Sequence, residues 1–206
     1  MAETLRVVIP PLPILTPGDI PGTHAGNDPR IAALIAAATG EIDGPDGWVG
    51  RAFGPQTLEM TGWLGGCRRI FLPCRPIISI VSVVVEDCDG AAEIVEPSAY
   101  RLDDKVDLVA ARGATWHQRP VKKIRYEAGY DGIAAEEDGT GEVPAQVKQA
   151  ITLAVLHMLS LGAENLFLRS EEVAGIGTRT YTVSDQAAGI IKKATEGLLA
   201  GLRVYQ

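Results

Sequence analysis

The side chains most able to bind a metal or act as nucleophiles are three histidines and three cysteines: His24, His117, His157, Cys67, Cys74 and Cys88. His117 and His157 have no His, Asp or Glu four residues away, as a metal pair on a helix would need. Six residues separate Cys67 from Cys74, a spacing that no common zinc motif uses. We therefore expect no metal site, no cofactor and no catalytic residue.

An odd number of cysteines with no disulfide framework indicates free thiols in a reducing compartment. Buried thiols are the favoured interpretation. A thiol-dependent hydrolase remains an alternative, because a cysteine and a histidine can meet in space without any sequence motif. Cys67, Cys74 or Cys88 would then pair with His117.

Sequence signatures of other enzymes are missing from the chain. There is no P-loop, no GxSxG, no HExxH and no paired CxxC. The net charge is −7, and no basic run of the kind that grips nucleic acid occurs. An acidic chain of this kind repels a DNA backbone that passes close to it.

The elements that would position these residues predict a mixed α+β chain. Residues 1–27 are rich in Pro and Gly and predict an extended arm. A helix begins at Asp28-Pro29, because Asp caps a helix and Pro suits its first position. Residues 53–130 predict about five to seven short strands in one sheet or small barrel, and 77–85 is the strongest of them.

The rest of the chain predicts a loop and two helices. Residues 131–142 (DGIAAEEDGTGE) are acidic and Gly-containing, and predict a mobile, solvated loop. Val143-Pro144 opens a helix that is apolar on more than one side, which predicts burial on more than one side. Residues 162–182 are irregular and run into the β-prone stretch 178–183. Ser184 can cap a last helix, which three glycines weaken, so packing or a partner must hold it.

Several patterns, taken in order, resemble the head–tail connector (adaptor) family of tailed phages over roughly residues 28–206. They are 32–39 (AALIAAAT), 50–53 (GRAF), 56–57 (QT), 72–77 (LPCRPI), 79–85, 97–101 (PSAYR), 125–130 (RYEAGY), 143–144 with 147–159, 171–173 (EEV), 180–182 (TYT) and 198–203 (LLAGLR).

The resemblance implies a small bundle of about three main helices with a β insertion between the first and second helices. The helical connector domain would comprise residues 28–52 and 143–206, and the β insertion residues 53–130. The arm 1–27 and the acidic loop 131–142 complete this division.

The resemblance also implies the function of a structural virion protein in the neck, assembled in the host cytoplasm. It would form a ring beneath the portal, commonly of twelve copies, and join the portal to a stopper or tail component. Genomic DNA would pass through the ring without sequence-specific binding. The residues expected to contact the portal or neighbouring subunits are Leu198, Leu199, Leu202, Arg203, Val204, Tyr205, Arg169, Glu171, Glu172 and Tyr181. A β-rich decoration protein or tail-associated binding module is an alternative.

Overall fold

The computed structural model describes residues 4–62, 68–87, 89–160, 170–173, 177–180 and 185–204. Helices and strands are both present, which confirms the mixed α+β class. The strands are β1 (Thr4–Ile9), β2 (Gln56–Thr61), β3 (Arg69–Phe71), β4 (Ile77–Glu86), β5 (Ala92–Ile94), β6 (Tyr100–Asp103), β7 (Asp107–Ala110), β8 (Val121–Ala128), β9 (Ser170–Val173) and β10 (Gly177–Thr180). The helices are α1 (Pro29–Gly40), α2 (Ala145–Ser160) and α4 (Asp185–Leu199), and short 3-10 turns include η4 (Ala135–Glu137) and η5 (Ala200–Leu202).

The chain forms two compact units, and each is built from separated pieces of sequence. The first comprises Met1–Ile14, Gly40–Val143 and Arg203–Gln206, and the second Leu15–Thr39 and Pro144–Leu202. Strands β1 to β8 belong to the first unit, and helices α1, α2 and α4 to the second.

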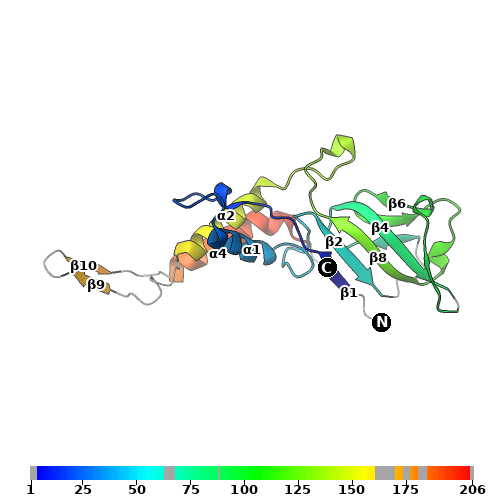
Figure 1. Ribbon diagram of the computed structural model, residues 1–206, viewed down its shortest axis with the longest axis horizontal. Coiled ribbons are helices and arrows are strands. Elements are labelled where there is room, and N and C mark those ends of the chain that lie inside the picture. Colours follow the sequence, from blue (N-terminus) through cyan, green and yellow to red (C-terminus); the bar gives the residue numbers. More distant parts are fainter. Residues whose placement is uncertain are drawn as a thin grey trace. The chain divides into compact units, whose positions relative to one another are not determined.

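A five-stranded antiparallel sheet forms the larger part of the first unit, with strand order β1-β2-β8-β4-β5 (Figure 1). Strand β4 matches the strand expected over 77–85 and extends to Glu86. It turns into β5 through Asp89-Gly90, where the N–H of Gly90 donates to the carbonyl of Asp87 at 2.9 Å. Gly90 has φ +80°, which a glycine adopts without strain.

A second, three-stranded sheet has the order β3-β7-β6. The short strands therefore divide between two sheets and do not form one continuous sheet. Both sheets contribute to one core, in which Leu58 and Ile124 of the first sheet cluster with Ile70 and Leu108 of the second. The alternation of apolar residues along each strand permits either arrangement, so it could not decide between them.

Helices of the second unit begin where the sequence indicates. Asp28 precedes α1, and its carboxylate accepts the N–H of Arg30 at 2.8 Å, as a helix cap does. Helix α2 buries Val147, Ala150, Ile151 and Val155 along one stripe and packs against α4. Among the described residues, no helix has both the length and the apolar character that a membrane crossing requires.

Strands also occur in the segment expected to be an extended arm and in the segment expected to be irregular. Residues 4–9 of the expected arm form strand β1, which pairs with β2 and so lies on its own chain. The expected irregular segment 162–182 contains the antiparallel pair β9–β10. Each of these segments becomes a strand by pairing with another segment of the chain. The composition of one segment does not show which other segment it pairs with.

Candidate interface sites

Three cationic side chains converge on one buried carboxylate on the face of the five-stranded sheet. Glu59 of β2 lies opposite Arg6 of β1 and Arg125 of β8. Its Oε1 accepts from Arg6 Nη2 at 2.6 Å and from Nε at 2.9 Å, and its Oε2 accepts from Arg125 Nη2 at 2.7 Å. Lys123 Nζ lies 3.4 Å from Glu59 Oε2. We call Arg6, Lys123 and Arg125 the basic patch.

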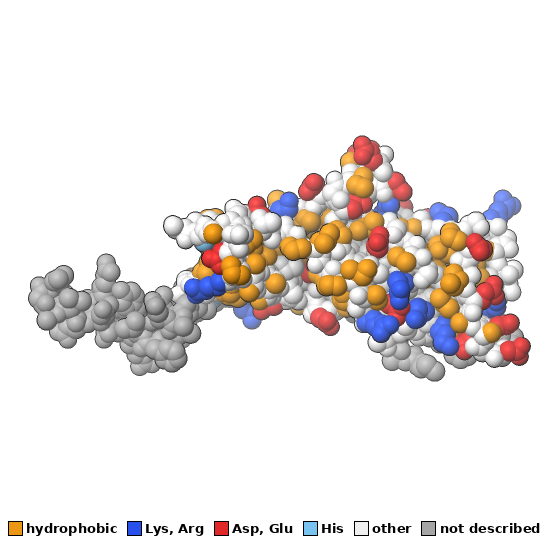
Figure 2. Space-filling view, in the orientation of Figure 1, with side chains coloured by type: hydrophobic (Ala, Val, Ile, Leu, Met, Phe, Trp, Pro, Cys, Tyr) orange, Lys and Arg blue, Asp and Glu red, His pale blue; other side chains and the backbone are white. Residues whose placement is uncertain are grey.

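The basic patch carries more positive charge than Glu59 neutralises. The Glu59 side chain is 0% exposed, whereas Arg6, Lys123 and Arg125 are 65%, 38% and 37% exposed. Burial alone would raise the pKa of Glu59, but hydrogen bonds from Arg125 and Arg6 outweigh it and lower that pKa. Glu59 is therefore ionised at neutral pH. Three cations around one anion leave a surplus of positive charge, and Lys and Arg side chains gather over these strands in Figure 2.

This patch was not expected, because its members lie far apart in the sequence. Residues 58 and 60 are apolar, so the alternation already places Glu59 on the opposite face of its strand. The missing information was the cross-strand register, which places Arg6 and Arg125 beside it.

The acidic loop 131–142 contains hydrogen bonds of its own. Asp131 Oδ1 accepts the N–H groups of Ile133 at 2.9 Å and Thr140 at 3.0 Å. The N–H of Gly141 donates to the carbonyl of Ile133 at 2.8 Å. The bonds from Thr140 to Asp131 and from Gly141 to Ile133 join the two arms of the loop.

The tip of this loop is fixed from outside as well. Lys105 Nζ donates to the carbonyl of Asp138 at 2.7 Å and forms an ion pair with its Oδ1 at 2.9 Å. Glu136 and Glu137, in the turn η4, are exposed. In Figure 2 acidic side chains gather at this projecting tip. The loop therefore presents carboxylates on a preformed backbone.

A second buried carboxylate, Asp43, organises the loop between α1 and β2. Its Oδ1 accepts the N–H of Phe53 at 2.7 Å and Gln56 Nε2 at 2.9 Å, and its Oδ2 accepts the N–H of Gly54 at 3.1 Å. Burial raises the pKa of Asp43, although these hydrogen bonds oppose the rise. Both of its oxygens accept from protein donors, so Asp43 serves the structure.

The expected interface residues near the C-terminus divide into two groups. Leu199 is fully buried, so in this conformation it has no surface to offer a partner. Leu198, Leu202 and Val204 are half-buried and Arg203 is exposed.

Residues 203 and 204 contact the first unit, to which they belong. The N–H of Val204 donates to the carbonyl of Val49 at 2.9 Å. The guanidinium of Arg203 lies 5.6 Å from the ring centroid of Trp48. This segment is therefore docked on residues 48–49 of its own chain.

The other expected interface residues are only partly visible. Glu171 and Glu172 lie on β9. Arg169, Tyr181 and Tyr205 lie outside the described residues.

The candidate thiol chemistry finds no support at Cys74. Burial raises the pKa of Cys74 to about 12, and the negative charges of Asp43 and Asp46 add to the rise. Within the described part of the chain, no hydrogen bond joins Cys74 to His117. Cys67 and Cys88 lie outside the described residues. No group of three or more His, Cys, Asp or Glu side chains among the described residues could hold a metal ion.

The sequence matches no family model and no curated protein. Its fold is similar to that of chains in solved particles. A chain of the virion of a native gene transfer agent particle is 19% identical, with a TM-score of 0.58, and the match covers 98% of this chain and 96% of that one. A chain of the neck of the empty particle, computed with C6 symmetry, is 18% identical, with a TM-score of 0.55 and the same coverage. A chain of the neck of the native particle, computed with C12 symmetry, is 18% identical, with a TM-score of 0.51, over 87% of this chain and 84% of that one.

These matches show a shared fold along nearly the whole chain. The fold is that of chains from phage-like particles, including their necks, and it is consistent with the resemblance to head–tail connectors.

Proposed function

We propose that this chain is a structural protein of the neck of a phage-like particle, where it acts as the adaptor between head and tail. The observation that carries the proposal is the fold match to a neck chain over 98% of this chain and 96% of that chain. A match of that extent includes both units, so it does not depend on one common submotif.

In this role the chain forms a ring beneath the portal, of twelve copies by the family resemblance, and contacts a stopper or tail component on its other side. The expected ring lines the channel through which DNA leaves the head. A net charge of −7 supports this role, because a negative wall repels the DNA backbone and does not hold it. The neck of the virion is its proposed location, after assembly in the host cytoplasm.

An enzymatic role is not favoured by the chemistry of the described residues. The raised pKa of Cys74 leaves its thiol protonated at neutral pH, and a thiol is a weak nucleophile in that form. The buried carboxylates Glu59 and Asp43 have their oxygens engaged by protein donors. We therefore propose a structural role without catalysis.

Cryo-electron microscopy of the native particle tests the location directly. The proposal expects density for this chain between the portal and the tail. Density for the chain on the capsid surface or along the tail, with none in the neck, would contradict it and would favour a decoration or tail-associated module.

Portal attachment can be tested with a deletion at the C-terminal end. Removing residues 197–206 would also remove the buried Leu199, so deletion of 203–206 is the cleaner variant. We expect this deletion to abolish capture of purified portal and to leave the far-ultraviolet circular dichroism spectrum unchanged. Glu196→Gln, an exposed change on α4, is the control and should bind normally. Undiminished portal capture by the deletion variant would refute this assignment.

A further inference from the structure

We infer that the acidic loop of one copy binds the basic patch of the next copy, so that the contact joins neighbouring subunits of the ring. The inference rests on the proposed function, since it identifies a subunit contact within the proposed assembly. It concerns two surfaces of the first unit, Glu136 and Glu137 at the tip of the loop and Arg6, Lys123 and Arg125 on the sheet.

The two surfaces are complementary in charge. Arg6 and Lys123 extend into solvent around a carboxylate that is already shared, so the patch can accept further carboxylates. At the loop tip Asp138 is paired with Lys105, whereas Glu136 and Glu137 are exposed. The negatively charged loop is therefore expected to attract the positively charged patch.

The loop is also shaped in advance for such a contact. Asp131, Thr140 and Gly141 close it with internal hydrogen bonds, and Lys105 fixes its tip. A preformed loop loses little conformational entropy when it binds, which favours association.

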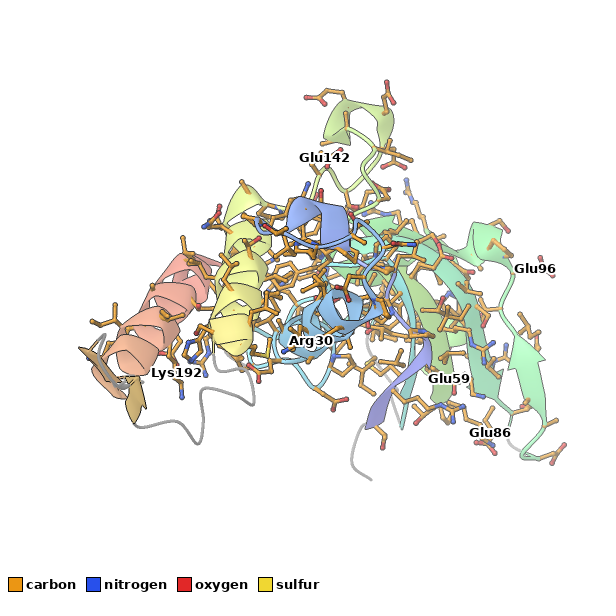
Figure 3. The ribbon with its side chains drawn as sticks, turned by 60° about the vertical axis from the view of Figure 1, so that its left-hand side comes forward. Arg30, Glu59, Glu86, Glu96, Glu142 and Lys192 are labelled. Carbon is orange, nitrogen blue, oxygen red and sulfur yellow. The ribbon has the colours of Figure 1, made fainter. Side chains whose placement is uncertain are left out.

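A loop and a patch at different places on one unit suit a head-to-tail contact. Figure 3 labels Glu59 on the sheet and Glu142 at the base of the loop, and the two lie well apart. In Figure 1 the loop likewise projects away from β1. A surface that meets a different surface of an identical copy generates a ring when the rotation closes. Each identical copy carries one loop and one patch, so in a closed ring every loop can meet a patch.

DNA is the competing occupant of the basic patch, and the charges favour the protein loop. The patch holds three cations that already share Glu59, and the whole chain is negative. Neutralising a DNA backbone generally requires several unshared cations. Measuring self-association and DNA binding of charge-reversed variants separates the two occupants.

Reversing the charges on each surface gives a test that distinguishes contact from general charge effects. One variant carries Arg6→Glu and Lys123→Glu, and the other carries Glu136→Lys and Glu137→Lys. Each variant alone should self-associate at least about tenfold more weakly than the wild-type chain in sedimentation velocity at low salt. Mixed together, they should associate again, because acidic loops then meet basic patches and basic loops meet acidic patches.

The charge reversals at positions 6 and 123 lie beside Glu59, so their effect on folding needs a separate check. Lys123→Gln keeps both guanidinium contacts to Glu59 and should weaken association by severalfold without changing the thermal unfolding midpoint. Lys148→Gln, on helix α2, is the matched loss of one cation and should leave association unchanged.

Carbodiimide crosslinking of mixed light and heavy isotope-labelled chains identifies the contact itself. We expect an amide between Lys123 of one isotope and Glu136 or Glu137 of the other. Lys105 and Asp138, 2.9 Å apart in one chain, supply an internal control that should link within a single isotope.

Several outcomes would overturn the inference. One is that Lys123 links to Glu136 or Glu137 only within chains of the same isotope. Another is that association does not recover when the two charge-reversed variants are mixed. A third is that the wild-type chain stays monomeric at millimolar concentration. Reduced DNA binding in the patch variant with unchanged self-association would assign the patch to DNA. Failure of this contact is distinct from failure of the neck proposal, because a chain seen in the neck could still lack the Lys123 crosslink.

Discussion

Glu59 and Arg125 lie directly opposite each other on β2 and β8, and both Nη2 and Nε of the guanidinium donate to Oε2, at 2.7 and 3.2 Å. The arginine remains partly exposed while the carboxylate is fully buried. A buried carboxylate in this position costs free energy unless cations and donors surround it. Arg6, on the other neighbouring strand β1, also donates to this carboxylate. Side chains from three adjacent strands therefore meet at Glu59.

Replacing Glu59 should destabilise the sheet. Glu59→Gln keeps the size of the side chain but removes the charge that Arg6 and Arg125 bind, and we expect a loss of about 1–3 kcal/mol in the free energy of unfolding. Urea unfolding followed by circular dichroism measures it. Glu127→Gln, an exposed change on β8, should cost much less. Equal losses in both variants would show that the buried charge contributes nothing special.

The stabilising effect of Glu59 should also depend on pH. Its pKa is lowered in the folded chain, so its contribution is fully present above the ordinary glutamate pKa of 4.5 and is lost as the pH falls through the folded value. The difference in stability between wild-type chain and Glu59→Gln should therefore shrink as the pH falls below 4.5. Unfolding curves at neutral and acidic pH measure this difference. A difference that grows toward acid would reverse the assigned direction of the pKa shift.

Asp43 should resist replacement by its amide. Both carboxylate oxygens accept from donors, so Asp43→Asn must direct an N–H₂ group at another donor. We expect a loss of about 1–3 kcal/mol, seen as a lower thermal midpoint. Asp46→Asn, an exposed change in the same loop, is the control. If both variants melt together, the hydrogen bonds to Asp43 do not organise this loop.

Gly129, between β8 and the acidic loop, should not accept a methyl group. It has φ +121°, and an added Cβ would lie 2.5 Å from the carbonyl oxygen of Gly54. Gly129→Ala therefore adds a backbone clash to the strain of its conformation. Gly113→Ala has positive φ and no atom within 4 Å of its Cβ, so it isolates the strain alone. We expect Gly129→Ala to lower the melting temperature several degrees more than Gly113→Ala, and equal shifts would exclude the clash.

Cys74 should be inert in the folded chain. With a pKa of about 12, fewer than about one thiol in a thousand is ionised at pH 8. Mass spectrometry after brief iodoacetamide treatment should find Cys74 unmodified in the folded chain and modified after unfolding in urea. Labelling at the rate of a free cysteine would reopen the thiol-hydrolase alternative.

Local patterns in the sequence predicted the elements well. Asp28-Pro29 starts α1 as expected, and the Ile/Val run at 77–85 forms β4. These features depend on residues that are close together in the sequence, so they can be predicted from the sequence alone. The pairing of β1 with β2 and the division of strands between two sheets depend on distant partners, and neither was predicted.

The basic patch illustrates the same limit for the candidate site. Arg6, Glu59 and Arg125 are ordinary solvated residues when each is considered alone. The register of β1, β2 and β8 brings them together, and register is a property of the sheet. The burial of Leu199 and the bond from Val204 to Val49 were not predicted, because nothing in the sequence indicates that residues 203–204 return to residues 48–49.

The interleaving of the two units has a consequence for synthesis on the ribosome. The first unit is made of Met1–Ile14, Gly40–Val143 and Arg203–Gln206, and the second is made of the residues between them. The sheet of the first unit can form once β8 has emerged, but the contact of Val204 with Val49 must wait until the whole second unit has been made. Translation thus imposes an order in which the sheet is complete before its final segment arrives, and the surface at Val49 stays open to other molecules during that interval.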